Sequence, residues 1–403
     1  MAEHLVTYTV IHQPRRLKLP AQPIPRGATP EDIARCLFDE KMNEKYLHKV
    51  AKYCYYPATR MFLEMAENDD FRLSLGLSLS FVRQAQLWDE ELYALIRKLA
   101  AHPNVELVCV EPYHSFLFYL DIEMFKRRMV WAQDQLEQIF GKRPVVTDTT
   151  EMFLSNDIYH ALDQAGFTGA LMDGREWVMN WRETTHLYNY NKKNLKLMAR
   201  HYKLSDDVGY RFSNKGWEGW PLQAADYAGW LREAMGEFVF LAWDYETFGE
   251  HHSRDTGIFE FMRHLPQAMK YRGIKTLTAS QALAQFSDRV YDLPLPQFPT
   301  TWAGSGGVEF FLGNAVQQAV FQLMHHAYNK ARLTGNPELI DLALWLMQSD
   351  NLHLIQWFGR IGQEAEVSAY FTPQEWWALG PAGIASELQQ VYKNFIVALD
   401  AYL

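Results

Sequence analysis

Short apolar runs alternate with longer amphipathic stretches over most of this 403-residue chain. The apolar runs have the length of buried strands and lie at residues 5–11, 73–81, 105–110, 144–147, 167–172, 195–199, 238–243 and 274–277. Most of the stretches between them have helical spacing, at residues 30–65, 89–101, 122–140, 156–165, 224–235 and 256–271. Strands that alternate with helices in this way predict a parallel sheet.

The number of strand–helix units indicates how this sheet is arranged. Seven or eight units follow one another in roughly 290 residues, which favours closure into a TIM-like barrel over an open doubly wound sheet. No Gly-x-Gly-x-x-Gly follows the first run, so a dinucleotide-binding fold gains no support.

Three prolines, Pro294, Pro296 and Pro299, mark the end of the alternating region, because proline continues neither a helix nor a central strand. Beyond them the chain has helical spacing and no strand pattern, at residues 314–330, 337–348 and 384–403. We therefore expect a catalytic barrel over residues 1–290 and a helical domain over residues 291–403 that contributes to the substrate cleft.

Composition excludes some partners and locations. The formal net charge is −9 and no basic patch is visible, which argues against nucleic-acid binding, because phosphates need clustered Lys and Arg. The three cysteines are odd in number and widely spaced, as in proteins of reducing compartments. No secretory signal pattern and no run of ~18 apolar residues is found, so we expect a soluble cytoplasmic protein without a membrane partner.

Polar residues follow several of the predicted strands where each strand ends. They are His12 after the first run, Glu111 and His114 after the third, Thr150 and Glu151 after the fourth, and Asp244 and Glu246 after the seventh. The carboxyl ends of parallel barrel strands share one face, and barrel enzymes react there. These side chains are therefore predicted to converge on one site.

Two carboxyl groups that face each other across a barrel mouth suit the cleavage of a glycosidic bond. One acid protonates the leaving oxygen, while the other attacks the anomeric carbon or activates water. Aromatic rings supply stacking faces for sugars, and Trp243 lies beside Asp244. His12 and His114 are candidates for hydrogen bonds to hydroxyl groups.

Short motifs along nearly the whole chain resemble, in order, the five motif regions of glycoside hydrolase family 57. They are His12-Gln13-Pro14, Val105-Glu106-Leu107 with Tyr113-His114-Ser115, Thr150-Glu151, Asp244-Tyr-Glu-Thr-Phe-Gly249 and Gln348-Ser-Asp350. The compact length also resembles the family's short intracellular α-amylase-like group. The resemblance implies an incomplete TIM-like (β/α)7 barrel followed by a C-terminal α-helical region.

The resemblance also implies an activity and roles for individual residues. It implies a retaining α-amylase-like hydrolase of α-1,4 linkages, with an α-glucan or maltooligosaccharide as substrate and no cofactor. Glu151 matches the nucleophile and Asp244 the general acid/base of a double displacement. The other matched residues line the family's substrate site: His12, Glu106, Glu246 and Asp350.

Two positions depart from the family pattern. Val10 stands where the first region often has His, and Asn351 stands where the last region often has His after Asp. Each departure removes one contact that the resemblance would otherwise imply.

Other interpretations of the same residues stay open. A 4-α-glucanotransferase or branching activity would use the same site, and a catalytically weak glucan-binding protein would keep the fold. A metal-dependent polysaccharide deacetylase would use Asp244, His251 and His114 as ligands. We expect no metal, because the adjacent His251 and His252 lack the i, i+4 spacing that brings two ligands together on a helix. Glu151 by itself also fits the first turn of the following helix, and the oligomeric state is undetermined.

Overall fold

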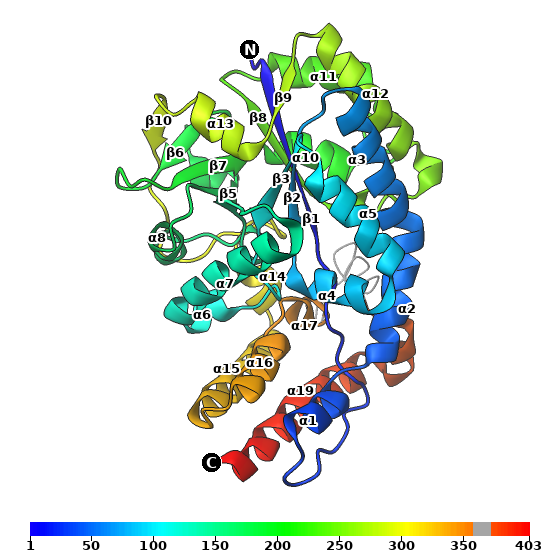
Figure 1. Cartoon of the computed structure of the whole chain (residues 1–403), viewed down its shortest axis with the longest axis vertical. Helices are drawn as coiled ribbons and strands as arrows, with labels where there is room; N and C mark the ends of the chain where they lie inside the picture. Colours follow the sequence, from blue (N-terminus) through cyan, green and yellow to red (C-terminus); the bar gives the residue numbers. More distant parts are fainter. Residues whose placement is uncertain (358–371) are drawn as a thin grey trace. The chain divides into compact units, whose positions relative to one another are not determined.

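The computed structural model describes residues 1–357 and 372–403 and divides the chain into two compact units (Figure 1). The first unit comprises residues 1–13, 46–112 and 123–302 and holds the strands of one sheet. The second comprises residues 14–45, 113–122 and 303–403, and its described part is mainly helical. These units differ from the expected division at residues 290/291, because residues 14–45 and 113–122 belong to the second unit and the first unit extends to residue 302.

The first unit is built on a ten-stranded sheet. Its parallel centre has the order β7-β5-β4-β3-β2-β1-β8, and β9 also pairs in parallel with β1. At one edge β6 is antiparallel to β7 and pairs in parallel with β10. The strands are β1 (His4–Ile11), β2 (Leu73–Leu77), β3 (Val105–Cys109), β4 (Val146–Thr147), β5 (Gly169–Asp173), β6 (Leu187–Asn189), β7 (Lys196–Arg200), β8 (Val239–Asp244), β9 (Lys275–Leu277) and β10 (Val290–Asp292).

The sheet curls until its two ends approach each other. The backbone N–H of His201, just after β7, donates to the carbonyl of Phe240 in β8 at 2.8 Å. No ladder joins β7 to β8 in the described part of the chain, so the barrel is incomplete. The predicted fold class, an incomplete (β/α)7 barrel with a C-terminal helical region, is confirmed.

The inside of the curled sheet is apolar and is covered at one end by a helix. Val6, Tyr8 and Val10 of β1 share one buried cluster with Phe240 and Ala242 of β8. Helix α13 (Ala279–Gln285) contributes further buried residues to this cluster. Because side chains alternate along a strand, Asp244 continues the inward-facing series of β8.

Helices cover the outer face of the sheet, and Figure 1 shows α3, α5 and α12 along one flank of β1. The helices of the first unit are α3 (Tyr56–Asn68), α4 (Leu79–Trp88), α5 (Glu90–Ala101), α7 (Ile122–Phe140), α8 (Asn156–Gln164), α9 (Glu176–Met179), α10 (Tyr202–Gly209), α11 (Ala224–Glu233), α12 (Ile258–Tyr271) and α13. The run predicted as one strand at 73–81 ends at Leu77, because Ser78 caps α4 by accepting from the Phe81 N–H.

The second unit packs α15 against both α16 and α19. Helix α15 begins with a capping box formed by Asn314 and Gln317. The helices of this unit are α1 (Pro30–Leu37), α6 (Leu117–Leu120), α14 (Glu309–Leu312), α15 (Ala315–Leu333), α16 (Pro337–Leu346), α17 (Asp350–His353) and α19 (Gly380–Ala398), while α2 (Glu40–Val50) passes into the first unit. No helix in the described ranges has the length and apolar character needed to cross a bilayer.

Candidate active site

The carboxyl ends of the central strands carry most of the first unit's candidate residues. His12 follows β1, Asp148 and Glu151 follow β4, Asp244 is the last residue of β8, and Glu246 follows it. Parallel strands place all of these ends at the same edge of the sheet. The structure therefore brings these five residues to one mouth of the barrel.

Glu151 is held in a strained turn between β4 and α8. Its φ of 50° is in the left-handed region, which costs a non-glycine residue about 1–3 kcal/mol. The Trp302 indole N–H donates to Glu151 Oε2 at 2.7 Å, and the Thr301 hydroxyl donates to its carbonyl at 2.5 Å. Helix α8 begins only at Asn156 after the Ser155 cap, so Glu151 is not in its first turn.

A hydrogen bond across the barrel interior joins β1 to the turn after β4. The Tyr8 hydroxyl donates to Asp148 Oδ2 at 2.7 Å, and the Thr149 N–H donates to Oδ1 at 2.6 Å. Gly76 of β2 makes room for this bridge, because a Cβ there would lie 2.5 Å from the Tyr8 hydroxyl oxygen. The bridge fixes the start of the turn that carries Glu151.

Asp148 is a buried acid whose pKa is affected by the charge of Asp244. Its side chain is only 2% exposed, and burial raises its pKa to about 7. The hydrogen bonds from Tyr8 and Thr149 oppose the shift, whereas the charge of Asp244 adds to it. The carboxyl groups at the ends of β4 and β8 are thus electrostatically coupled.

Glu246 is a second perturbed acid at the mouth. Burial is the main cause that raises its pKa to about 8, and the charge of Asp244 contributes. The Tyr55 hydroxyl donates to Glu246 and accepts from the Gln13 side-chain amide at 2.8 Å. Tyr55 belongs to a single π-helical turn, a distortion that is frequent at functional sites.

His12 is oriented by the cap of α4. Its Nδ1 lies 2.9 Å from the Ser78 hydroxyl, and the Ser78 N–H donates to the Ile11 carbonyl at 3.1 Å. Ser78 therefore holds the imidazole at the end of β1 while it also caps the helix.

An ion pair joins the last residues of β5 and β7 and lies near Trp302. Arg200 donates to the Ala242 carbonyl at 3.0 Å and pairs with Asp173 at 3.2 Å. Its guanidinium lies 5.8 Å from the Trp302 ring centre. Since Trp302 also binds Glu151, these contacts tie the turn after β4 to β7 and β8.

Glu106 lies at the other end of its strand. It is the second residue of β3, and its Oε2 accepts from the backbone N–H of Ser280 in the first turn of α13 at 3.0 Å. Burial raises the pKa of Glu106, and the hydrogen bonds oppose that shift. These contacts favour a structural role, and they do not support the predicted substrate contact.

Trp243 packs away from the barrel interior. Its indole N–H donates to the Ser205 carbonyl of α10 at 2.7 Å, and the side chain is 2% exposed. Its ring meets Phe248 edge to face at 5.7 Å. The neighbours of Trp243 on β8, Ala242 and Asp244, take the inward positions, so this placement favours packing over the predicted sugar contact.

In the second unit the structure brings His114 and the segment before Asp350 together. Ser115 and Gln348 form an isolated antiparallel bridge, and the Ser349 N–H donates to the His114 carbonyl at 2.8 Å. Asn351 is buried and donates to the Leu346 carbonyl at 3.0 Å and to Tyr392 at 3.1 Å. Asn351, the residue that differs from the family pattern, therefore stabilises the packing within this unit.

Metal-ligand candidates do not cluster in residues 1–357 and 372–403, where no group of three or more His, Cys, Asp or Glu side chains fits an ion. His252 Nδ1 instead lies 2.8 Å from the Ser213 hydroxyl. Burial lowers the pKa of His251 to about 4, and it also lowers that of His252.

Sequence reasoning missed the aromatic residues that donate hydrogen bonds to three acids of the site, Asp148, Glu246 and Glu151. Tyr8, Tyr55 and Trp302 come from distant parts of the chain and look like ordinary core aromatics in the sequence. A signal was available only for Asp148, which directly follows a predicted strand.

The sequence is similar to known glycoside-degrading proteins. The sequence model of glycosyl hydrolase family 57 matches residues 8–294. A protein of Methanocaldococcus jannaschii named "Putative alpha-amylase" is 31% identical over 369 residues, which cover 87% of this chain and 76% of that protein.

Solved structures share the fold. The 4-alpha-glucanotransferase from Thermococcus litoralis has a TM-score of 0.67 at 14% identity, over 93% of this chain and 61% of that one, so this chain spans about three fifths of its length. A GH57 branching enzyme from Thermococcus kodakaraensis has a TM-score of 0.66 at 14% identity, over 100% and 97% of the two chains. The curled sheet, the acids at its strand ends and the match over residues 8–294 agree, and the chain belongs to glycosyl hydrolase family 57.

Proposed function

We propose that this chain is a retaining enzyme that cleaves the α-1,4 linkages of α-glucans. The proposal rests on the electrostatic coupling between the carboxyl groups at the ends of β4 and β8. Asp148 precedes Glu151 in the turn after β4, and its pKa responds to Asp244 at the end of β8. In this proposal Glu151 is the nucleophile and Asp244 the general acid/base, and the two carboxyl groups stand about 5–5.5 Å apart.

The first step joins the sugar to the enzyme. The Glu151 carboxylate attacks the anomeric carbon while the bond to the leaving glycosidic oxygen breaks, and Asp244 gives its proton to that oxygen. The Trp302 indole N–H donates to Glu151 Oε2 and helps to hold this carboxylate in position for the attack.

The second step releases the sugar. Asp244 takes a proton from a water molecule, whose oxygen attacks the anomeric carbon and frees the Glu151 carboxylate. A sugar hydroxyl in place of water would give transfer, so the same residues serve a hydrolase or a 4-α-glucanotransferase. We assign the chain to hydrolysis, following its named relative.

Neighbouring groups prepare the acid and hold the sugar. Below about pH 7 both Asp148 and Glu246 are mainly protonated, so each can donate or accept a hydrogen bond without adding charge beside Asp244. His12 is the proposed partner of a sugar hydroxyl. His114 and Asp350 of the second unit are proposed as further substrate contacts on the family resemblance alone.

The test is incubation of the purified chain with maltoheptaose, followed by chromatography of the products over time. We expect shorter maltooligosaccharides whose anomeric configuration is retained at the first time points. Longer products would assign the chain to transfer. No change in maltoheptaose or soluble starch would refute the proposed activity.

The deacetylase alternative loses support because the family match is to glycosyl hydrolases. Acetate release from an acetylated polysaccharide, abolished by a chelator and restored by zinc, would revive it.

A further inference from the structure

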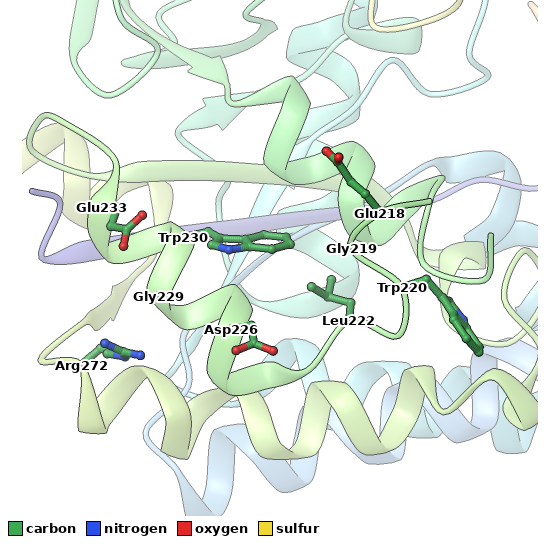
Figure 2. A pocket seen from close by; sticks show the side chains of 9 residues that line it. All are labelled: Glu218, Gly219, Trp220, Leu222, Asp226, Gly229, Trp230, Glu233 and Arg272. Atoms are coloured by element: carbon green, nitrogen blue, oxygen red, sulfur yellow. The ribbon is translucent and has the colours of Figure 1, made fainter. Parts of the chain in front are cut away.

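A pocket of about 390 Å³ opens on the first unit, away from the strand ends (Figure 2). The loop before α11, the helix α11 itself and the residue after α12 form its walls. Figure 2 shows Glu233 and Arg272 at one end, Trp220 at the other, and Trp230 with Asp226 between them. None of these residues belongs to the barrel mouth that carries Glu151 and Asp244.

The aromatic floor of the pocket is fixed in place. The Trp230 ring meets Trp217 edge to face, with centroids 6.2 Å apart, and meets Tyr227 at 6.2 Å in the same manner. Trp230 is half-buried, and its side chain lines the pocket (Figure 2). Trp220 adds a second indole that is 43% exposed. A ligand with an apolar face can therefore pack against the indoles of Trp220 and Trp230.

Arg272 reaches the pocket across a glycine. A Cβ on Gly229 would lie 3.6 Å from a terminal nitrogen of the Arg272 guanidinium, which is an ordinary van der Waals contact. The guanidinium therefore lies against α11 at Gly229, where it lines the pocket.

The charged side chains of the pocket are available to a ligand. Asp226 and Glu233 lie seven residues apart on one face of α11, and Glu218 comes from the loop. Among the residues that the structure describes, neither these three carboxylates nor Arg272 forms a side-chain hydrogen bond or an ion pair. The carboxylates can accept hydrogen bonds from hydroxyl groups, and the guanidinium can donate to hydroxyl or ring oxygens.

The chemistry of this lining selects a ligand class. Three carboxylates against one guanidinium disfavour an anion, and the many charged groups disfavour a wholly apolar molecule. A neutral molecule that carries many hydroxyl groups and an apolar ring face satisfies both the acids and the indoles. Sugar rings have this combination, and about 390 Å³ lies near the lower end of the usual range for ligand sites, roughly 300–1,000 Å³.

We propose that this pocket is a second, non-catalytic binding site for a short segment of an α-glucan chain. The choice of an α-glucan rests on the proposed function, whereas the choice of a neutral sugar rests on the pocket. A long glucan held there remains attached to the enzyme, which raises its effective concentration for the catalytic residues. A short maltooligosaccharide bound at the mouth gains nothing from the second site.

The experiment compares a pocket variant with a matched surface control. The double substitution Trp220→Ala/Asp226→Asn removes an exposed indole and one acid, and Trp181→Ala removes another indole that is 81% exposed and lies outside the pocket. Each protein is run through native gels containing glycogen or no glucan, and KM and kcat are measured on amylose and on maltotetraose. Circular dichroism checks that each variant is folded.

We expect the pocket variant to bind glycogen about threefold to tenfold more weakly and its KM for amylose to rise by a similar factor. Its kcat, and both constants for maltotetraose, should stay within twofold of the wild type, and Trp181→Ala should behave as the wild type. Equal glycogen retardation and equal KM for amylose in the wild type and the pocket variant would overturn the second site alone. If the wild type neither binds nor cleaves any of these glucans, the proposed function fails, and the second site fails with it.

Discussion

Acids that are partly or fully buried occupy both ends of the curled sheet, but their surroundings differ. At the amino end Glu106 accepts hydrogen bonds from Ser280 in the first turn of α13 and from Ser74. At the carboxyl end Asp148 accepts from Tyr8 and Thr149, and it also lies in the field of another acid, Asp244. Burial raises the pKa of both Glu106 and Asp148.

The difference lies in what each acid faces. Glu106 faces only groups that stabilise it, since a helix N-terminus favours negative charge. Asp148 and Glu246 each lie near a further carboxylate, an arrangement that costs stability and is retained where protons are exchanged. A raised pKa alone therefore does not mark an active site. The groups around the acid distinguish a structural acid from a candidate catalytic one. Four substitutions test this difference between the two ends of the sheet.

The largest effect is expected for Glu151→Gln at the carboxyl end. Loss of the proposed nucleophile should lower kcat on maltooligosaccharides by about 10⁴-fold or more, while glucan binding stays within a few-fold of the wild type. Steady-state kinetics and calorimetric titration with maltoheptaose measure the two quantities. Turnover at the wild-type rate would remove Glu151 from the mechanism.

Asp148→Asn should alter the pH dependence of activity as well as its size. Above about pH 7 the ionised Asp148 places a negative charge near Asp244 and so favours retention of the acid/base proton. Without that charge the alkaline limb of the kcat profile should move to lower pH by about 1 unit, and kcat at the optimum should fall about tenfold. Asp157→Asn, at an exposed position on α8, is the control. An unchanged limb would show that Asp148 does not act on the acid/base.

Trp243→Phe changes a residue that was predicted from the sequence as a sugar contact. In the structure its side chain instead packs against α10. The buried Ser205 carbonyl would lose its donor and a small cavity would form, so the free energy of unfolding should fall by about 1–3 kcal/mol. Chemical denaturation measures the loss. KM for maltooligosaccharides should stay within twofold, and a large rise in KM without loss of stability would restore Trp243 as a sugar contact.

The smallest effect is expected for Glu106→Gln at the amino end. Because the folded-state pKa of Glu106 is raised above its ordinary 4.5, its protonated form stabilises the fold, and that stability is lost as pH rises through the folded-state pKa. The Gln variant resembles the protonated side chain and cannot ionise, so it should stay within about 1 kcal/mol of the wild type at low pH. It should be more stable than the wild type above the folded-state pKa, and its unfolding free energy should depend less steeply on pH. Its kcat profile should match that of the wild type, and a shifted profile would connect Glu106 to catalysis.

The sequence predicted the central strands well because each is a local pattern of buried residues. All eight predicted runs contain a strand, whereas β6 and β10 were missed because a strand of only three residues carries little periodicity. Segment 14–45 also belongs to the second unit, which no local pattern indicates. Whether such a segment packs with one unit or the other depends on contacts far along the chain.

The candidate site also combines residues that could be predicted from the sequence with residues that could not. The order of the motifs was enough to propose Glu151 and Asp244, since strand ends in a parallel barrel must meet. The placement of Trp243 could have been read from strand alternation, because Asp244 and Ala242 take the inward positions of β8. Tyr8 and Tyr55 could not have been found, since a hydrogen bond across 140 or 191 residues leaves no local mark.

Residue patterns of short range were enough to predict the alternation of strands and helices and the family to which the chain belongs. The folded structure was needed to show which acids lie near another carboxylate and which accept a hydrogen bond from a helix N-terminus. A carboxyl group takes its pKa and its use from the groups that fold around it, and those groups come from distant parts of the chain.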